Sequence, residues 1–326
     1  MKSIYKVTVL AAVGAAALAL AGNALATQKL EVSQAANSLT VRVSKTDADP
    51  QPAKITIYIP TGYTLNTSQA PGTVIGTTEG EVVANQLGGI PVPLSGDVVV
   101  DDPAKHLTDA CAPGMHQAVW VLRLSVLNQT IPVPVYIDAT AGAETALGVA
   151  KGQLCLSRGD TPTGTPLHFA TFTVNGIFTP PATAARWVGF WIPYAAGGVV
   201  NPAGTVETRS VVGPGEVSLA AKVTSKKKKQ VTLSGTVTQS GVGVATKVSL
   251  LVNGKAKASA TANASGRYSK KVKGTGRRAT FQAKVNVAAR DLGAAGCASP
   301  TNPAFQCVSA TAGGFTATSR KVTVRF

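Results

Sequence analysis

Val248-Ser-Leu-Leu-Val-Asn-Gly-Lys-Ala-Lys257 is the stretch that decides the fold class of this chain. Two short runs suited to β-strands flank Asn253-Gly254, a dipeptide typical of a two-residue hairpin turn. Similar runs rich in Val and Thr recur through the sequence, and the 33 Gly and 19 Pro residues punctuate them. Beyond the first 26 residues we find no long apolar pattern at helical spacing. The sequence therefore predicts an all-β protein built from antiparallel strands.

The region around this hairpin is expected to hold six or seven strands, at 222–225, 230–237, 245–252, 255–262, 267–272, 280–287 and 315–325. Within it, Leu233-Ser-Gly-Thr-Val237, Val248 to Gly254 and Ala264-Ser-Gly-Arg-Tyr268 resemble motifs of bacterial Ig-like and carboxypeptidase-regulatory-like modules. The resemblance covers roughly residues 232–287. It implies an Ig-like β-sandwich. Because such modules usually serve as spacers, adhesive units or stalks, it also favours a non-enzymatic role.

The preceding region predicts a second antiparallel β-sandwich of eight or more strands. The clearest runs are 39–44, 54–59, 97–100, 118–126, 132–137, 167–174, 187–192 and 205–212. Long loops are expected between positions 61 and 96. This region resembles uncharacterised secreted proteins of high-GC bacteria, a likeness that implies no particular activity.

Charge divides the chain in the same way as the strand pattern. Residues 217–326 hold 13 Lys and 6 Arg against a single acid, Asp291, so their net charge is +18. Residues 27–216 hold 10 basic and 14 acidic residues, a net charge of −4. Regions with such different fields indicate separate domains. We predict an acidic β-sandwich domain at 27–212, a linker at 213–216 and a basic Ig-like domain at 217–326.

The first 26 residues predict a secretory signal peptide. Lys2 and Lys6 precede an apolar run over 7–22, and Ala24-Leu-Ala26 supplies small residues before a cleavage site near Ala26. An uncleaved anchor is the alternative. No later segment is apolar for long enough to span a membrane, so we expect a secreted or cell-surface protein without a transmembrane segment in its mature chain.

The four cysteines indicate two disulfides, because export places the chain in an oxidising environment. Cys111 with Cys155 and Cys297 with Cys307 is the favoured pairing, since each bond then stays within one charge region.

The basic region is the principal candidate binding site. Its clustered charges are Lys226, Lys227, Lys228, Lys229, Lys255, Lys257, Lys270, Lys271, Lys273, Arg277 and Arg278. Lys outnumbers Arg and aromatic residues are few, a composition that disfavours sequence-specific nucleic-acid recognition. The pattern favours nonspecific, salt-sensitive binding to anionic cell-envelope or extracellular polymers. A solvated surface that keeps the protein soluble is the alternative.

A second candidate is the segment Arg186-Trp-Val-Gly-Phe-Trp-Ile-Pro193. On a strand, Trp187 and Trp191 would share one face and could form a strip on which sugar rings stack. The alternative is a central strand buried on both faces, which also explains the continuous apolar run.

Signals for catalysis are sparse, and we predict no catalytic residue, metal or cofactor. His106, His116 and His168 are the only histidines, and neither a zinc-protease nor a serine-hydrolase motif occurs. Cys111-Ala-Pro-Gly-Met-His116 resembles a cupredoxin copper loop, but no histidine precedes His106 to complete a copper site. We therefore expect a non-enzymatic protein. An exported hydrolase, a carbohydrate-binding protein and a purely structural stalk or adhesion module are the alternatives.

Overall fold

The computed structural model describes residues 27–326 apart from positions 36, 127–128, 160, 163 and 298. The predicted signal peptide at 1–26 lies outside the described residues. Strands dominate the described chain, and its helices are short 3-10 turns, so the predicted all-β fold class is confirmed. These turns are η1 (Asn85–Leu87), η2 (Pro103–His106), η3 (Gly142–Ala146), η4 (Pro202–Gly204) and η5 (Gly293–Cys297). In the described part of the chain, no helix has the length and apolar character needed to cross a membrane.

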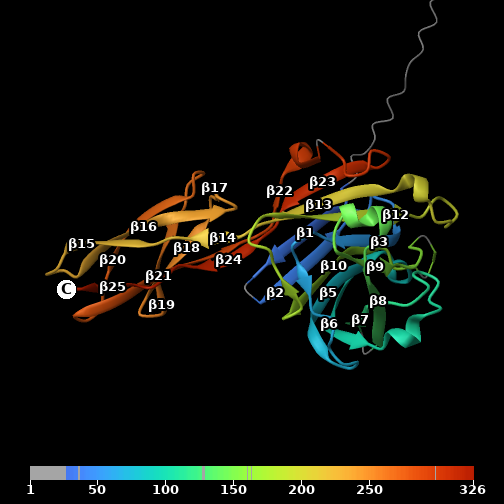
Figure 1. The fold of residues 1–326 in the computed structure, drawn as a ribbon, viewed down its shortest axis with the longest axis horizontal. Helices are drawn as coiled ribbons and strands as arrows, with labels where there is room; N and C mark the ends of the chain where they lie inside the picture. Colours follow the sequence, from blue (N-terminus) through green and yellow to red (C-terminus); the bar gives the residue numbers. More distant parts are fainter. Residues whose placement is uncertain (1–26, 36, 127–128, 160, 163, 298) are drawn as a thin grey trace, which may run out of the picture.

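The protein has two lobes, each with its own hydrophobic core. We call residues 27–214 with 290–312 the main lobe, and residues 215–289 with 313–326 the basic lobe. The basic lobe extends away from the main lobe and ends at the C-terminus (Figure 1). Residues 215–289 of the basic lobe thus interrupt the main lobe in the sequence, and residues 290–312 of the main lobe interrupt the basic lobe.

A single curled sheet forms the main lobe. Its antiparallel neighbours follow the order β1 (Lys29–Gln34), β2 (Ser38–Ser44), β10 (Leu167–Asn175), β5 (Val74–Ala84), β6 (Ile90–Asp101), β7 (Ala118–Val126), β8 (Gln129–Ala139), β9 (Ala150–Cys155), β3 (Pro52–Ile59), β12 (Ala185–Pro193) and β13 (Val206–Val212). The two ends of this series meet, because the Val32 N–H of β1 donates to Ser210 Oγ of β13 at 3.0 Å. The short strands β4 (Thr64–Leu65) and β11 (Phe178–Thr179) pair with each other beside it.

Alternation of side chains along these strands turns an apolar face inward. Trp120 of β7 and both Trp187 and Trp191 of β12 are only 1% exposed in this core. All eight strands expected in this region are present. The expectation of long loops between 61 and 96 is corrected in part, because β5 and the first half of β6 occupy half of that stretch. Backbone pairing of β5 with both β6 and β10 holds a segment that is rich in Thr, Glu and Gly.

The segment 290–312 returns from the basic lobe to the main lobe. It forms β22 (Arg290–Asp291), η5 and β23 (Gln306–Ala312), and β23 pairs in parallel with β13. Thr311 Oγ1 of β23 also donates to the Leu30 carbonyl of β1 at 2.7 Å. Chain order predicted that this segment belongs to the basic domain, whereas its strand pairing joins it to the main lobe.

A buried ion pair anchors the disulfide-closed loop 297–307 on β13. Arg209 Nε donates to Glu207 Oε1, and their side chains are 4% and 0% exposed. Glu207 Oε2 accepts the Thr301 N–H at 2.8 Å, and Arg209 Nη1 donates to the Gly296 carbonyl at 3.2 Å. Cys297–Cys307 and Cys111–Cys155 are both bonded, as the sequence predicted.

The basic lobe is a sandwich of two antiparallel layers around one core. One layer contains β14 (Gly215–Val217), β15 (Ala220–Ser225), β16 (Gln230–Gln239), β17 (Val242–Gly243) and β20 (Arg267–Lys273). The other contains β19 (Lys255–Thr261), β18 (Lys247–Val252), β21 (Arg278–Val287), β24 (Phe315–Thr318) and β25 (Val322–Arg325). The predicted hairpin joins β18 and β19, with φ of 50° at Asn253 and 80° at Gly254, as a type I′ turn requires.

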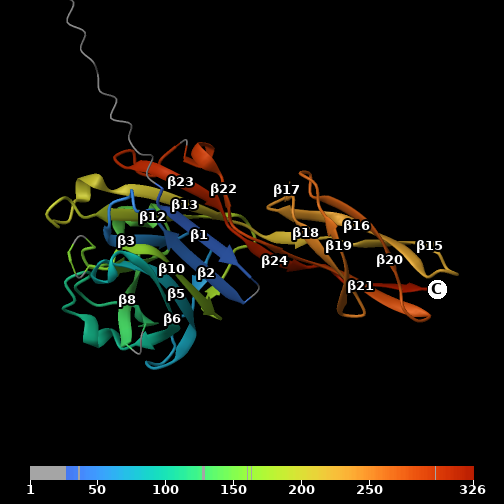
Figure 2. The ribbon, with the colours of Figure 1, turned by 180° about the vertical axis from the view of Figure 1, so that it is seen from behind.

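The chain crosses the junction between the lobes three times, because each lobe consists of two separate segments. Figure 2 shows this junction from behind. Glycines allow these crossings to pack closely. A Cβ on Gly215 would lie 1.8 Å from the Phe315 ring, and one on Gly313 would lie 2.1 Å from the Val32 carbonyl oxygen. The predicted linker 213–216 thus includes the start of β14, which pairs with β16.

Candidate functional site

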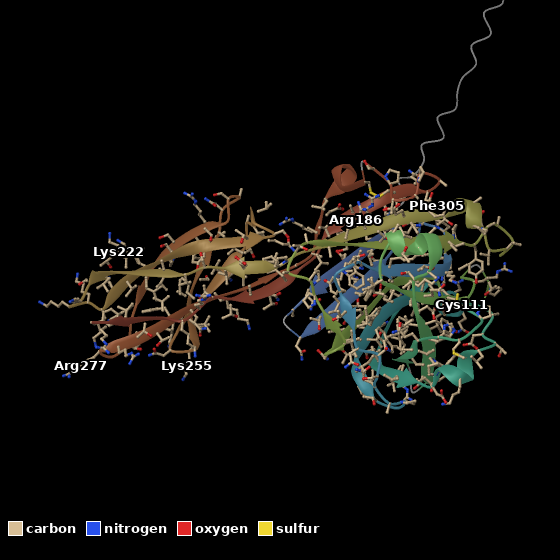
Figure 3. All side chains as sticks on the ribbon, in the orientation of Figure 1. Cys111, Arg186, Lys222, Lys255, Arg277 and Phe305 are labelled. Carbon is tan, nitrogen blue, oxygen red and sulfur yellow. A yellow bond between two sulfur atoms is a disulfide. The ribbon has the colours of Figure 1, made fainter. Side chains whose placement is uncertain are left out.

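Turns and the chain terminus meet at the end of the basic lobe farthest from the main lobe, where Figure 3 labels Arg277. The Gly274 N–H donates to the Lys229 carbonyl at 2.8 Å, which joins the β15–β16 turn to the end of β20. The Phe326 N–H donates to the Arg277 carbonyl at 2.9 Å, which places the chain terminus beside the next turn.

We call this cluster the basic tip. Its members are Lys226, Lys227, Lys228, Lys229, Lys273, Arg277, Arg278 and Arg325. All are exposed except Lys229, which is half-buried. Each charge therefore reaches solvent while the backbone beneath it is held by neighbouring turns.

The β18–β19 turn completes this end of the lobe. Asn253 Nδ2 donates to Thr275 Oγ1, and Asn253 Oδ1 accepts the Thr280 N–H, both at 2.8 Å. Lys255 follows this turn directly and lies next to the tip. The Asn253 side chain thus links the hairpin to the turn that carries Arg277.

Arg278 of β21 pairs directly with Arg325 of β25. Like charges placed directly opposite each other destabilise an antiparallel pair. Arg325 was absent from the predicted site, because the sequence alone does not give the register that brings the two together. The repulsion at this position would be relieved by an anionic ligand.

The other predicted basic residues lie along two edge strands. Lys255 and Lys257 are on β19, and Lys270 and Lys271 are on β20; each of these strands pairs on one side only among the described residues. Lys270 has the same strand parity as the buried Val272, yet it is exposed. Inward-facing or exposed Lys on edge strands blocks unwanted pairing between sheets. This structural role competes with ligand binding for these four residues.

The observed chain path sharpens the division of charge. The basic lobe holds 18 basic residues and one acid, Glu216, for a net charge of +17. Asp291 lies in the main lobe and pairs with Lys29 at 3.0 Å. In the part of the chain that the structure describes, no basic residue of the basic lobe forms a salt bridge. The field of this lobe is therefore uncompensated by its own carboxylates.

Trp187 and Trp191 do not form a surface for stacking sugars. Both side chains point into the core, and Trp191 Nε1 donates to Thr208 Oγ1 at 2.9 Å within it. Trp187 packs edge to face against Tyr63, with ring centroids 5.1 Å apart. The prediction of an exposed sugar-binding strip is therefore wrong, and the alternative, a buried central strand, describes this segment.

The cupredoxin-like loop carries no free thiol, because Cys111 is bonded to Cys155. A blue-copper site needs a cysteine thiolate, so this loop lacks the required ligand. His116 Nε2 instead lies 2.8 Å from the Ala112 carbonyl oxygen, and its Nδ1 lies 2.9 Å from Asp138 Oδ1. The loop is held by a disulfide and a buried histidine.

His106 and His168 each bridge two carboxylates. His106 lies 2.7 Å from Asp109 and 3.2 Å from Asp101. Burial opposes the rise in the pKa of His106, but hydrogen bonds to these two carboxylates raise it overall. His168 lies 2.9 Å from Glu81 and 2.7 Å from Asp47, and hydrogen bonding to Glu81 is the main cause of its raised pKa.

A polar cleft of about 670 Å³ lies beside His116, and Lys54, Asp138, Glu144 and Lys151 also line it. Its side chains are largely engaged with one another or with the backbone. Lys151 Nζ lies 2.7 Å from Glu144, and Lys54 Nζ donates to a backbone carbonyl at 3.1 Å. Burial and the nearby charge of Lys151 lower the pKa of Lys54.

No protein-family model matches the chain, and no curated protein matches it significantly. Among solved structures, a tetra-tandem repeat from the extending region of a large adhesion protein aligns at a TM-score of 0.28 and 11% identity, covering 89% of this chain and 81% of that chain. A 1.5-MDa bacterial ice-binding adhesin aligns at 0.21 and 14%, covering 90% and 96%. A Ca²⁺-stabilized adhesin of an Antarctic bacterium aligns at 0.18 and 16%, covering 87% and 82%. TM-scores this low do not establish a shared fold or indicate what this chain does.

Proposed function

We propose that this is a secreted or cell-surface protein without enzymatic activity whose basic lobe binds anionic envelope or extracellular polymers. The observation that carries the proposal is the net charge of +17 on 89 residues, with the basic tip exposed at the end of an extended lobe. Phosphate or carboxylate polymers can satisfy such charges without a shaped pocket. The contacts are nonspecific and do not read nucleotide sequence.

The histidine geometry supports a non-enzymatic role. General-base catalysis requires a ring nitrogen within hydrogen-bond reach of the substrate. Both ring nitrogens of His106, His116 and His168 already face acceptors of the protein itself. This arrangement suits structural histidines better than the general base of an exported hydrolase.

The two-layered sandwich of the basic lobe supports its resemblance to Ig-like modules, which we include in the proposal. The two disulfides support export to an oxidising compartment. An anion-binding module at the end of an extended lobe suits attachment to a charged surface.

The test uses the intact mature chain, residues 27–326. A fragment beginning at 217 would contain β23 without β13, its partner strand in the main lobe. Binding would be measured on immobilised polyphosphate and polygalacturonate across a range of salt concentrations. If six or more charges engage a densely charged polymer, affinity should fall by roughly 10³-fold or more between about 50 and 200 mM salt.

Two variants of equal charge locate the site. The tip variant replaces Lys226, Lys227, Lys228, Lys273 and Arg277 with Gln, and the control replaces Lys247, Arg267, Lys284, Arg320 and Lys321 with Gln; all ten positions are exposed. The tip variant should lose more affinity and show a shallower salt dependence. Equal losses would place binding in the general field of the lobe. Absence of binding by the unaltered chain at low salt would contradict polymer binding and favour a purely structural stalk.

A further inference from the structure

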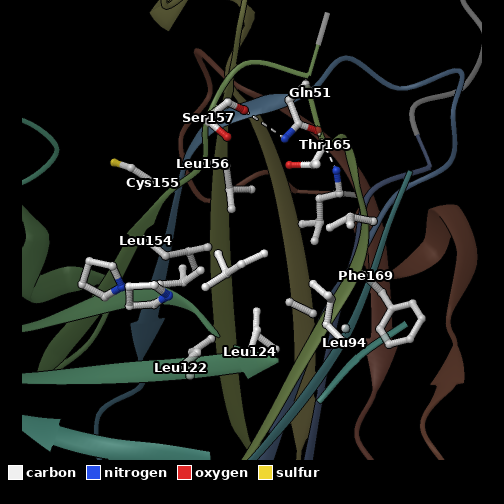
Figure 4. Close-up of a pocket in the computed structure, with 18 residues that line it drawn as sticks. Gln51, Leu94, Leu122, Leu124, Leu154, Cys155, Leu156, Ser157, Thr165 and Phe169 are labelled. Carbon is white, nitrogen blue, oxygen red and sulfur yellow. Dashed lines mark hydrogen bonds between the residues drawn. The ribbon is translucent and has the colours of Figure 1, made fainter. Parts of the chain in front are cut away.

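The main lobe contains an apolar cavity of about 250 Å³ that is separate from the basic tip (Figure 4). Val82, Leu94, Leu122, Leu124, Leu154 and Leu167 are among its apolar lining residues, and no lining residue is charged. These side chains come from five strands, β5, β6, β7, β9 and β10, and β8 contributes further lining residues at the opening. The cavity is therefore set within the sheet of the main lobe.

A split between β8 and β9 opens the wall of this cavity. β8 pairs with β9 only from Tyr136 to Ala139, although β8 begins at Gln129. Pro132 and Pro134 line the cavity within the stretch of β8 that pairs with β7 but not with β9. Proline cannot donate to a strand ladder, so two prolines at alternate positions disfavour closure of this seam. The sequence thus builds the opening into the sheet.

Apolar side chains continue from the cavity to its rim. Ile131 of β8 lines the cavity and is 40% exposed. Exposed aliphatic residues beside an apolar cavity reduce the cost of desolvating an entering hydrocarbon.

Neutral polar groups occupy one end of the cavity, where Gln51, Ser157 and Thr165 lie together (Figure 4). Gln51 Oε1 accepts the Leu167 N–H at 3.0 Å, which fixes the amide at this end. The hydroxyls of Ser157 and Thr165 can both donate and accept hydrogen bonds. These groups suit an uncharged oxygen function, whereas the uncharged lining offers no counter-ion to a carboxylate or phosphate.

We propose that this cavity binds a single unbranched hydrocarbon chain that ends in an uncharged oxygen group, such as an alcohol. Its volume lies below the roughly 300–1,000 Å³ of typical small-molecule pockets, which favours a slender chain over fused rings or a two-chain lipid. The leucine wall contacts the chain, and the Gln51 end orients its oxygen. This site is independent of polymer binding by the basic tip.

The test is calorimetric titration of the mature chain with 1-octanol and, as a matched charged probe, octanoate near neutral pH. We expect saturable binding of 1-octanol with a stoichiometry of one. Octanoate should bind at least about tenfold more weakly, because its carboxylate would be desolvated without a partner. Equal affinity for the two probes would overturn the assignment of an uncharged end group, and no saturable 1-octanol binding would overturn the site.

Variants place the binding in the cavity. Ala170→Leu adds side-chain volume at a lining position and should abolish binding, whereas Ala256→Leu on β19 is the matched control in the other lobe. Ile131→Gln changes a partly exposed rim residue, keeps the fold and should weaken 1-octanol binding by about tenfold. Unchanged binding by either folded cavity variant would contradict the proposal.

Discussion

Glu207 and Arg209 lie two residues apart on β13 with their side chains almost fully buried. Replacing Glu207 with Gln would leave the Arg209 guanidinium buried without its counter-charge. We expect Glu207→Gln to lower the free energy of unfolding by about 3–5 kcal/mol, because an uncompensated buried charge is strongly destabilising. Urea unfolding followed by tryptophan fluorescence would measure the change.

An exposed ion pair provides the control for this prediction. Lys105 lies 2.9 Å from Asp101, with side-chain exposures of 65% and 31%. Lys105→Gln should leave the free energy of unfolding nearly unchanged, because exposed surface pairs contribute little. Similar losses for the two variants would contradict the role given to burial.

His168 makes stability depend on pH. Hydrogen bonding to Glu81, and then to Asp47, raises its pKa in the folded state. The stabilisation is fully present below the unfolded-state pKa and is lost as pH rises through the folded-state pKa. His168→Gln should therefore destabilise the protein at about pH 5.5, by up to about 1 kcal/mol, and have little effect at about pH 9. Urea unfolding at both pH values tests this, and a larger loss at the alkaline value would reverse the assigned sign.

At the scale of the strand, the lysines of β19 and β20 lie on two sheet edges and disfavour pairing with strands of another molecule. Lys257→Val with Lys270→Val would leave these edges apolar and able to pair with another copy of the chain. We expect increased self-association by light scattering, with stability unchanged to within about 0.5 kcal/mol.

The matched control is Lys247→Val with Lys284→Val. These exposed lysines lie on β18 and β21, which have strand neighbours on both sides. The control removes the same charge but exposes no edge, so it should stay monodisperse at the concentration at which the edge variant associates. Association of both variants would show that lost charge, and not edge protection, is responsible.

Local chemistry made several strands and turns predictable. Asn253-Gly254 determines its own turn, because both residues adopt the positive φ that a type I′ hairpin requires. β5 escaped prediction because its central residues, Gly76 to Gly80, lack alternating aliphatic side chains. Its stability as a strand comes from pairing with β6 and β10. The cavity was also not predictable from local sequence, because its leucines come from strands that lie far apart in the chain.

On the scale of the whole molecule, the charge contrast was visible in the sequence, but its spatial boundary was not. Asp291 follows Glu216 in the chain, yet it pairs with Lys29 in the main lobe. Counting charge along the chain therefore assigned its only late acid to the wrong side of the junction. Parallel pairing of β23 with β13 is a long-range contact that local composition does not encode.

The return of β23 also sets an order for folding. Thr311 Oγ1 donates to the Leu30 carbonyl across 281 sequence positions. The first strand, β1, therefore gains this contact only after β23, one of the last strands, has been synthesised. Domains usually fold as units from the N-terminal end during synthesis. Here the main lobe acquires β23 only after residues 215–289 have emerged. The main lobe can therefore complete its fold only late in synthesis. A chain whose synthesis stops before β23 lacks the strand that pairs with β13, so its main lobe stays incomplete.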